Sequence, residues 1–331
     1  MKGIFWKSVV LAAACGLSWP AGAQSSSTQT ASYPSKPIRL INEFVAGSGG
    51  DALLRVVVSG MQPLLGQPVV IENRAGAGGL VAAEAVRNAA PDGYTLLGAT
   101  PNVQVTRLFL ARTQPFDAQK SFTPIVALSD PVFVLMAHPS VPANNLKELI
   151  ELARREPGKL SYATSGVGSN SHLGGEQIKM LAGVDIVHVP YKALAESARD
   201  VVAGLIPLGF NLSAQAVPLV KSGKVKLLAV ATSARLPLFP DVPTVNEALP
   251  AFEQPPGWTG LFGPAGLPPA LASRIASDAV KAMSQPEIKS KINDVGFNII
   301  GGTPEEFSAL IRRQTQLVGR IVKAAGVQPV E

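Results

Sequence analysis

The residues of this sequence that are best suited to chemistry are glycines and small polar residues gathered in three loops. The first loop reads EFVAGSGGD from Glu43 to Asp51 and lies between a strand-like run and a helix-forming segment. Free backbone N–H groups at a helix start, together with the helix dipole, suit an anion, and glycines let a ligand approach the backbone closely. Asp51 is also a good N-cap for the following helix. The candidate ligand contacts in this loop are Ala46, Gly47, Ser48, Gly50 and Asp51.

The second and third loops offer neutral hydrogen-bonding groups. Thr100 and Asn102 follow a strand-like run that begins at Tyr94, and ordinary turn chemistry is the alternative role for both residues. The third loop reads TSGVGSNSH from Thr164 to His172, between a predicted strand and a predicted helix. The neutral hydrogen-bond donors of this loop, together with the N-terminus of the helix that follows, would bind a carboxylate well. The alternative is that this segment is a flexible surface loop. The candidate contacts there are Thr164, Ser165, Gly166, Ser169 and Asn170.

Several charged or polar residues lie near the ends of other predicted strands. Tyr191 and Lys192 follow one strand-like run and Asn211 ends another, so we expect them at the same cleft; a solvated side chain is the alternative for Lys192. His172 and Glu176 are spaced i, i+4, but a metal site needs more ligands and the other two histidines show no helpful spacing. We expect no metal, no cofactor and no catalytic residue, because G-x-S-x-G, HExxH and Walker A patterns do not occur.

One motif favours a different class of protein. Gly47 to Ala52 fits the pattern G-x-G-x-x-G/A after a predicted strand, and Glu72 ends the second strand, where a ribose-binding acid would lie. Taken alone, the motif indicates an exported dinucleotide-dependent oxidoreductase. Glycines also serve simple tight turns, and the export signal and the inserted second lobe described below argue against that reading. A ligand-free interaction module is a third possibility.

Strand and helix signals alternate along the chain, which predicts an α/β fold with mainly parallel sheets. The clearest unit runs from Leu65 to Leu97 as a strand, a glycine-rich loop, a helix, the turn Pro91-Asp92-Gly93 and a second strand. The chain from Pro268 to Ala325 is almost wholly helical in pattern. Further strands are expected at residues 38–42, 160–164, 185–189, 205–211 and 225–231.

Two segments are expected to connect two lobes. The apolar run from Val126 to Ala137 is longer than one buried strand needs and is interrupted by Asp130-Pro131, so we expect it to leave one lobe and enter another. Trp258 to Phe262 is the expected return crossing. One lobe would then comprise residues 33–128 plus 256–331 and the other 129–255, with a hinge and an interlobe cleft, a favoured place for ligands.

The N-terminus reads as an export signal. Lys2 and Lys7 form a positive region, an apolar stretch too short to span a bilayer follows, and small residues precede Gln24. We expect residues 1–23 to be a signal peptide cleaved after Ala23, and residues 24–32 to be a flexible leader. The alternatives are a lipoprotein processed at Cys15 and an uncleaved anchor. No later segment has the length and hydrophobicity of a transmembrane helix.

Composition excludes other classes. Removing the signal peptide leaves 308 residues, which suggests two domains, and lowers the formal charge from +6 to +4. Cys15 is the only cysteine, so the mature chain would have no disulfide. Lysine and arginine are scattered and aromatic residues make up 6% of the chain, whereas a nucleic-acid binder would need a basic face with stacking aromatics. A mild positive excess helps draw anionic solutes to a cleft.

The sequence resembles the substrate-binding proteins of tripartite tricarboxylate transporters, also called Bug or TctC-like proteins, from about Tyr33 to Gln328. The phrases that carry the resemblance are, in chain order, Tyr33-Pro34 with Lys36-Pro37-Ile38-Arg39, Glu72-Asn73-Arg74, Pro91-Asp92-Gly93-Tyr94-Thr95-Leu96-Leu97, Pro157-Gly158-Lys159-Leu160-Ser161-Tyr162-Ala163, His188-Val189-Pro190-Tyr191-Lys192, Pro240-Asp241-Val242-Pro243-Thr244, Gly263-Pro264-Ala265-Gly266 and Gly302-Thr303-Pro304-Glu305-Glu306-Phe307. So many ordered phrases make the resemblance specific.

The resemblance implies a type II periplasmic-binding-protein-like receptor that closes around a small carboxylated solute: a dicarboxylate, an acidic amino acid or an aromatic acid. It implies that the loop from Phe44 to Gly50 holds one carboxylate through backbone groups and ordered waters, and that Thr164 to Asn170 adds contacts. A monomer in the periplasm that passes its solute to membrane permease subunits, or serves sensing, is the expected working form. The sequence departs from the family pattern at Asn42-Glu43, at Ala193 in place of a glycine, and at Asn211 in place of an aspartate.

Overall fold

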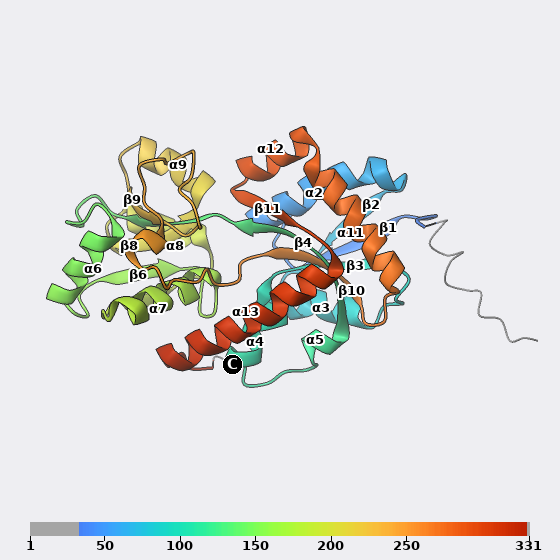
Figure 1. Cartoon of the computed structure of the whole chain (residues 1–331), viewed down its shortest axis with the longest axis horizontal. Coiled ribbons are helices and arrows are strands. Elements are labelled where there is room, and N and C mark those ends of the chain that lie inside the picture. Colours follow the sequence, from blue (N-terminus) through green and yellow to red (C-terminus); the bar gives the residue numbers. More distant parts are fainter. Residues whose placement is uncertain (1–32, 330–331) are drawn as a thin grey trace, which may run out of the picture. The chain divides into compact units, whose positions relative to one another are not determined.

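A computed structural model describes residues 33–329, and within them the chain forms two α/β lobes, each built around one β-sheet (Figure 1). The signal peptide, leader and lipoprotein predictions, over residues 1–32, lie outside the described residues. The first sheet has the strand order β11-β4-β10-β3-β1-β2 and consists of β1 (Ile38–Asn42), β2 (Val69–Asn73), β3 (Thr95–Ala99), β4 (Phe122–Pro131), β10 (Thr259–Pro264) and β11 (Phe297–Gly301). The second sheet has the order β7-β6-β8-β5-β9 and consists of β5 (Phe133–Ala137), β6 (Ser161–Thr164), β7 (Val187–Pro190), β8 (Leu208–Leu212) and β9 (Lys226–Val230).

Helices alternate with these strands along most of the chain. In the first lobe they are α2 (Gly49–Leu65), the 3₁₀ turn η1 (Ala77–Gly79), α3 (Leu80–Arg87), the π-helical turn η2 (Asn102–Thr106), α4 (Arg107–Leu110), α5 (Ala118–Ser121), α11 (Pro269–Ser284), α12 (Pro286–Asp294) and α13 (Pro304–Ala325). In the second lobe they are α6 (Leu146–Arg155), α7 (Asn170–Ala182), α8 (Leu194–Val202), α9 (Ser213–Lys221) and α10 (Val245–Ala248).

Both sheets are mixed, so the expectation of mainly parallel sheets was wrong. Strand β1 pairs in parallel with β2 and β3, and β6 pairs in parallel with β7 and β8. Strands β10, β11 and β5 pair antiparallel with their neighbours. The antiparallel strands β4, β5 and β10 adjoin the two crossings between the lobes. Strand β10, which returns from the second lobe, runs antiparallel to β3.

The chain passes from the first sheet to the second at Val132, between β4 and β5, and returns just before β10 at Gly257. The first crossing lies within the predicted segment Val126–Ala137, and the second lies one residue before the predicted segment Trp258–Phe262. Contacts join the chain from Pro34 onward into one compact unit, so the lobe boundaries at residues 128, 129, 255 and 256 stay a prediction. The C-terminal segment differs from expectation, since the short strand β11 lies between helices α12 and α13.

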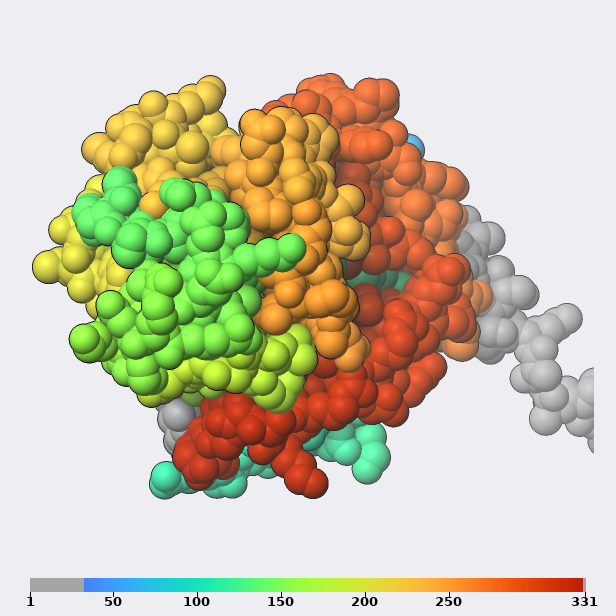
Figure 2. All heavy atoms as spheres, turned by 60° about the vertical axis from the view of Figure 1, so that its left-hand side comes forward, coloured from blue at the N-terminus to red at the C-terminus, as the bar shows by residue number. Residues whose placement is uncertain are grey.

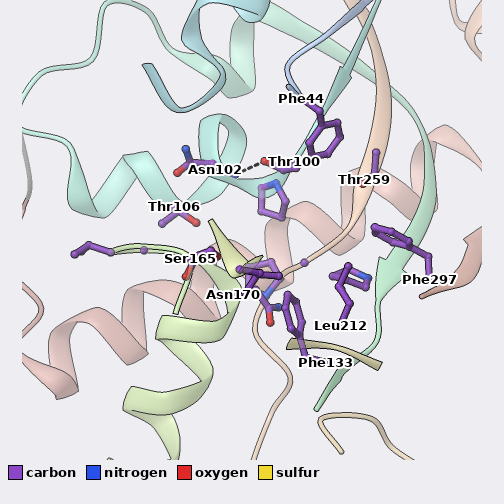
Figure 3. A pocket seen from close by; sticks show the side chains of 18 residues that line it. Phe44, Thr100, Asn102, Thr106, Phe133, Ser165, Asn170, Leu212, Thr259 and Phe297 are labelled. Carbon is purple, nitrogen blue, oxygen red and sulfur yellow. Dashed lines mark hydrogen bonds between the residues drawn. The ribbon is translucent and has the colours of Figure 1, made fainter. Parts of the chain in front are cut away.

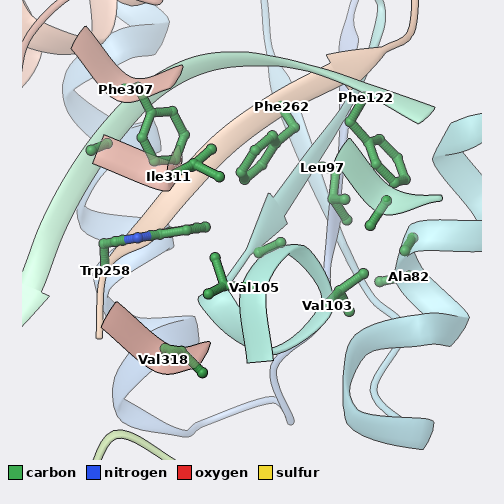
Figure 4. Packing of buried hydrophobic residues seen from close by; sticks show 14 of the residues in the cluster. Ala82, Leu97, Val103, Val105, Phe122, Trp258, Phe262, Phe307, Ile311 and Val318 are labelled. Carbon is green, nitrogen blue, oxygen red and sulfur yellow. The ribbon is translucent and has the colours of Figure 1, made fainter. Parts of the chain in front are cut away.

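One hydrophobic cluster of the first lobe lies between the sheet and helices α3 and α13 (Figure 4). Trp258 is fully buried there, and its ring packs edge-on against Phe307, with centroids 4.9 Å apart. Its indole N–H donates to Gln314 Oε1 at 2.6 Å, which satisfies the buried donor. Helix α13 begins at a capping box formed by Thr303 and Glu306, which stabilises the start of the helix. The buried side chains that follow it, from Phe307 to Ile321, pack the helix against the sheet.

The second lobe has a separate core, in which α8 and α9 pack on one face of the sheet. Helix α7 packs on the other face, where Gly175 lies against the ring of Tyr162. Figure 2 shows atoms of this lobe, in green to gold, meeting the red helix α13 low in the view, with a hollow above that contact. Over residues 33–329, we find no helix with the length and hydrophobicity needed to cross a membrane.

Candidate functional site

A cavity of about 330 Å³ lies where the two lobes meet, and both lobes line it (Figure 3). The first lobe contributes side chains from the ends of β1 and β3 and from η2, and the second contributes the loop between β6 and α7. Both crossing segments also border the cavity, through Pro131 at one crossing and Pro256 and Gly257 at the other. The cavity is thus bounded by the segments about which the lobes would have to move.

Six of the sixteen predicted contacts line this cavity. They come from all three loops singled out in the sequence: Phe44, Thr100, Asn102, Ser165, Ser169 and Asn170. The ten that do not line it are Ala46, Gly47, Ser48, Gly50, Asp51, Thr164, Gly166, Tyr191, Lys192 and Asn211. Most of these ten form hydrogen bonds within the protein.

Asp51 organises the first loop from inside the protein. Its carboxylate is 2% exposed and accepts hydrogen bonds from Asn42 Nδ2, Asn73 Nδ2, the backbone N–H of Gly47 and Arg55 Nε, all at 2.8–2.9 Å. Burial alone would raise the pKa of Asp51, but these hydrogen bonds outweigh it and lower that pKa. The N-cap of helix α2 is Ser48, so Asp51 ties the loop to β1 and β2 instead.

Three backbone donors of the first loop are already used by the protein. Phe44 N–H donates to Asn42 Oδ1 at 3.0 Å and Gly47 N–H donates to Asp51. Ser48 N–H donates to the carbonyl of Val45 at 3.1 Å. Of this loop, Phe44 lines the cavity, and its ring packs directly on Gly50, where a Cβ would collide with it.

Glu43 joins the first loop to the second. Its Oε1 accepts the backbone N–H of Thr100 at 2.8 Å, while its buried Oε2 lies against Gly79 without a hydrogen-bond partner among the described residues. Burial raises the pKa of Glu43 to about 7. On the same side, Asn102 Nδ2 donates to the carbonyl of Gly78 at 2.7 Å. The glycines of the Leu65–Leu97 unit thus make room for Glu43 and Asn102.

The third loop is held by the start of helix α7. Ser169 is the N-cap: its Oγ accepts from His172 N–H and donates to the carbonyl of Gly166 at 2.7 Å. The backbone N–H of Gly168 donates to His172 Nδ1 at 3.0 Å. Since Nδ1 accepts this bond, the proton of the neutral His172 ring lies on Nε2. Asn170 reaches across to the return crossing and donates to the carbonyl of Pro255 at 2.5 Å.

The remaining predicted contacts have partners within the second lobe. Thr164 Oγ1 and His188 Nε2 share a hydrogen bond of 2.7 Å. Tyr191 donates to Asp200 Oδ2 at 2.8 Å, and Asn211, 2% exposed, accepts the backbone N–H of Leu212. Lys192 is exposed and outside the cavity lining.

Twelve of the eighteen residues that line the cavity are not among the sixteen named contacts, although Val167 and Gly168 lie within the Thr164–Asn170 range that the resemblance implied. The missed residues are Pro101, Thr106, Pro131, Phe133, Val167, Gly168, Leu194, Leu212, Pro256, Gly257, Thr259 and Phe297. Four of them are apolar residues at strand ends, where their type indicates core packing: Pro131, Phe133, Leu212 and Phe297. The two crossing segments were the available signal, because a cavity between lobes must be bordered by the chain that joins them.

The two features that favoured a dinucleotide site, the Gly47–Ala52 motif and Glu72, make contacts within the protein and do not line the cavity. Glu72 forms an ion pair with Arg39 at 2.7 Å, and the bond from Arg39 lowers the pKa of Glu72. Gly47 lies outside the cavity lining. A search of residues 33–329 finds no group of three histidine, cysteine or acidic side chains arranged to hold a metal ion.

Comparison with known proteins gives one consistent result. The model of the tripartite tricarboxylate transporter family receptors matches residues 53–327. A UPF0065 protein from the tcbD-tcbE intergenic region of Pseudomonas sp. strain P51 is 32% identical over 286 residues, which cover 86% of this chain and 84% of that protein. BugT of Bordetella pertussis is 28% identical over 298 residues, covering 89% and 91% of the two chains.

Solved structures with the same fold match almost end to end. A periplasmic transporter structure is 37% identical with a TM-score of 0.77 and covers 89% of this chain and 99% of its own. Rpa4515 of R. palustris, solved with adipate, is 29% identical with a TM-score of 0.80 and coverage of 90% and 100%. MatC (Rpa3494) of Rhodopseudomonas palustris, with bound malate, is 30% identical with a TM-score of 0.74 and coverage of 88% and 100%.

Proposed function

Because this chain belongs to the family of tripartite tricarboxylate transporter receptors, we propose that it is a periplasmic receptor that binds a small organic carboxylate between its two lobes. In this proposal the chain performs no catalytic step. The bound solute is passed to membrane permease subunits or is read by a sensing system. The mature chain works as a monomer after export.

The observation that carries the proposal is the joint lining of the interlobe cavity by neutral polar groups from both lobes. Thr100 and Asn102 come from the first lobe, and Ser165, Ser169 and Asn170 come from the second. A carboxylate held by donors on both sides would stabilise the closed arrangement of the lobes over an open one. Two similar proteins were solved with adipate and with malate, both small carboxylates.

Trp258 provides a direct way to follow binding. The sequence has three tryptophans, and two of them, Trp6 and Trp19, belong to the predicted signal peptide. A chain that starts at Gln24 therefore retains only Trp258, whose neighbours Gly257 and Thr259 line the cavity. Ligand entry should change its fluorescence.

The test is a titration of this shortened chain with adipate, malate, glutamate and benzoate, followed by Trp258 fluorescence and thermal unfolding. A ligand at 100 times its dissociation constant should stabilise the folded state by about 2.7 kcal/mol. Failure of every carboxylate to bind the folded protein would contradict the proposal. Copurification of a nicotinamide or flavin would favour the oxidoreductase reading instead.

A matched pair of variants locates the site. Ser165 lines the cavity and its hydroxyl makes no hydrogen bond to any of the residues in 33–329, so Ser165→Asp adds a negative charge without breaking one. Ser233→Asp adds the same charge at an exposed turn. We expect Ser165→Asp to weaken carboxylate binding at least about tenfold through like-charge repulsion, and Ser233→Asp to leave it unchanged.

A further inference from the structure

The interlobe cavity has two ends of different chemistry (Figure 3). Asn102, Thr106 and Ser165 lie together at one end, on the left of the view. Phe133, Leu212 and Phe297 lie at the other end, on the lower right. A ligand that fills the cavity must therefore have a polar part and an apolar part.

The apolar end is one continuous wall. Phe133 and Leu212 lie directly opposite each other on the adjacent strands β5 and β8, so their side chains share one face of the sheet. Leu212 and Phe297 both approach Gly49, where a Cβ would lie 3.5 Å from Leu212 Cδ1 and 3.8 Å from Phe297 Cε2. The wall thus combines side chains of both lobes around one apolar space.

Charged side chains do not line any part of this cavity in residues 33–329. The side chains of the apolar wall offer a carboxylate no hydrogen-bond partner, and taking an unpaired carboxylate out of water costs several kcal/mol per ion. A solute with carboxylates at both of its ends is therefore disfavoured. The wall instead suits an apolar body, and aromatic rings in particular.

A cation lies beyond the polar end. A second cavity of about 190 Å³ shares Asn102, Thr106 and Val167 with the first and is also lined by Arg107. Arg107 donates to the carbonyl of Thr113 at 3.5 Å, and it makes no ion pair within the described part of the chain. Its positive charge makes the polar end the favourable place for a single carboxylate.

We propose that the physiological ligand is a monocarboxylate with an apolar, ring-bearing body, whose carboxylate lies at the Asn102–Ser165 end and whose ring lies against Phe133, Leu212 and Phe297. The inference rests on the proposed receptor function and narrows its ligand class. A volume of about 330 Å³ is at the small end of the range for ligand cavities, which suits a ring with a short acidic chain.

The test compares three probes of similar length on the chain that starts at Gln24: 3-phenylpropionate, its neutral amide, and adipate. We expect 3-phenylpropionate to bind at least about tenfold more tightly than adipate, because only the ring gains burial at the apolar wall. We expect the amide to bind at least about tenfold more weakly than the acid, because it lacks the charge that Arg107 favours.

Variants of the apolar wall test where the ring lies. Phe297→Leu removes the aromatic contact and should lower the preference for 3-phenylpropionate over adipate at least about threefold. Phe122→Leu is the matched control, because Phe122 is a buried residue of β4 that does not line the cavity. Leu212→Lys places a cation at the wall and should shift the preference toward adipate.

The outcomes separate the two proposals. Adipate binding as tightly as 3-phenylpropionate would overturn the ligand class and leave the receptor function intact. The amide binding as well as the acid would overturn the placement of the carboxylate. Absence of binding by every carboxylate, including adipate, malate, glutamate and benzoate, would overturn the receptor function itself.

Discussion

His172 and His188 stack with their ring centroids 4.0 Å apart and their planes 24° apart, directly beneath the third ligand loop. His172 Nδ1 holds the backbone N–H of Gly168, and His188 Nε2 bonds Thr164 Oγ1 at the start of the loop. Burial, together with the positive charge of Lys179, lowers the pKa of both rings, and the pKa of His188 falls to about 3. The loop that faces the cavity therefore depends on two neutral imidazoles.

This pair predicts a loss of stability in acid. An unfolded histidine takes up a proton near pH 6.5, whereas the folded His188 does so only near pH 3. Since the unfolded state binds more protons over this interval, the contribution of His188 to stability is full above pH 6.5 and declines as the pH falls toward 3. We expect a loss on the order of 2 kcal/mol, less than the full pKa difference would give because the His188 ring is partly exposed to solvent, and urea unfolding at several pH values measures it.

The control for this prediction preserves the hydrogen bond. In His188→Gln the side-chain amide can still reach Thr164, so this variant should flatten the acid limb of the profile. His138, which bonds Ser140 away from the stacked pair, provides His138→Gln as the matched variant that should not change it. An unaltered acid limb in His188→Gln would show that the stacked pair is not its source.

Glu43 predicts an opposite trend closer to neutrality. Burial raises its pKa to about 7, so between about pH 4.5 and pH 7 the folded state binds the proton that the unfolded state has lost. The contribution of Glu43 to stability should then fall by about 3 kcal/mol as the pH rises through this window, and stay level above it. The difference in unfolding free energy between the wild-type chain and Glu43→Gln from pH 4.5 to 8 measures the effect, because the titration of His188 acts in the opposite direction below pH 6.5.

Glu43→Gln should remove this dependence and raise stability at pH 8. The amide oxygen can still accept the Thr100 N–H, and no charge is buried. Glu72→Gln is the matched control, because the hydrogen bond from Arg39 lowers the pKa of Glu72 and moves its titration out of the window. Equal profiles for the wild type and Glu43→Gln would mean that the Glu43 carboxyl is solvated.

A substitution at Gly168 tests the contact between the third loop and the first lobe. Its φ is +77°, and a Cβ there would lie 2.8 Å from Leu110 Cδ1 and 2.9 Å from Thr106 Cγ2. Gly168→Ala should therefore cost about 1 kcal/mol of backbone strain and also push the loop away from Thr106. We expect carboxylate affinity, followed by Trp258 fluorescence, to fall at least about tenfold.

A substitution at Gly183 separates the backbone strain from the displacement of the loop. It ends helix α7 with a φ of +63°, and a Cβ there would have no atom within 4 Å. Gly183→Ala should thus carry the same backbone strain and keep the affinity for ligand. Equal affinities in the two variants would indicate that the approach of Gly168 to Thr106 has no part in binding.

The sequence predicted the fold better than the site, for a physical reason. Strand β1 was expected at residues 38–42 and lies at Ile38–Asn42. The prediction succeeded because most residues of this strand are buried, and buried β-branched and aliphatic residues give a sequence pattern that is typical of a strand. Strand β11 was missed because Phe297–Gly301 is a short strand at the edge of its sheet, with helices before and after it. A local pattern of five residues between two helices carries little strand signal.

The site depends on which residues meet in space. Ser165 and Asn170 could be recognised because polar loops after strands commonly bind ligands. Phe133, Leu212 and Phe297 could not, because an apolar residue at a strand end has the same pattern whether it faces the core or a cavity. Conversely, Asp51 and Gly47 looked exposed in a glycine-rich loop, yet they bond to each other within the protein.

Two adjacent glycines at the start of helix α2 give a final prediction about the first loop. A Cβ at Gly50 would collide with the Phe44 ring, which lines the cavity, whereas a Cβ at Gly49 would make only ordinary contacts with Leu212 and Phe297. Gly50→Ala should displace the Phe44 ring and change ligand affinity by about tenfold or more. Gly49→Ala should keep the affinity and stabilise the helix by up to about 1 kcal/mol. Calorimetric titration and thermal unfolding of both variants measure these effects, and unchanged affinity in a folded Gly50→Ala would mean that the Phe44 ring does not shape the site.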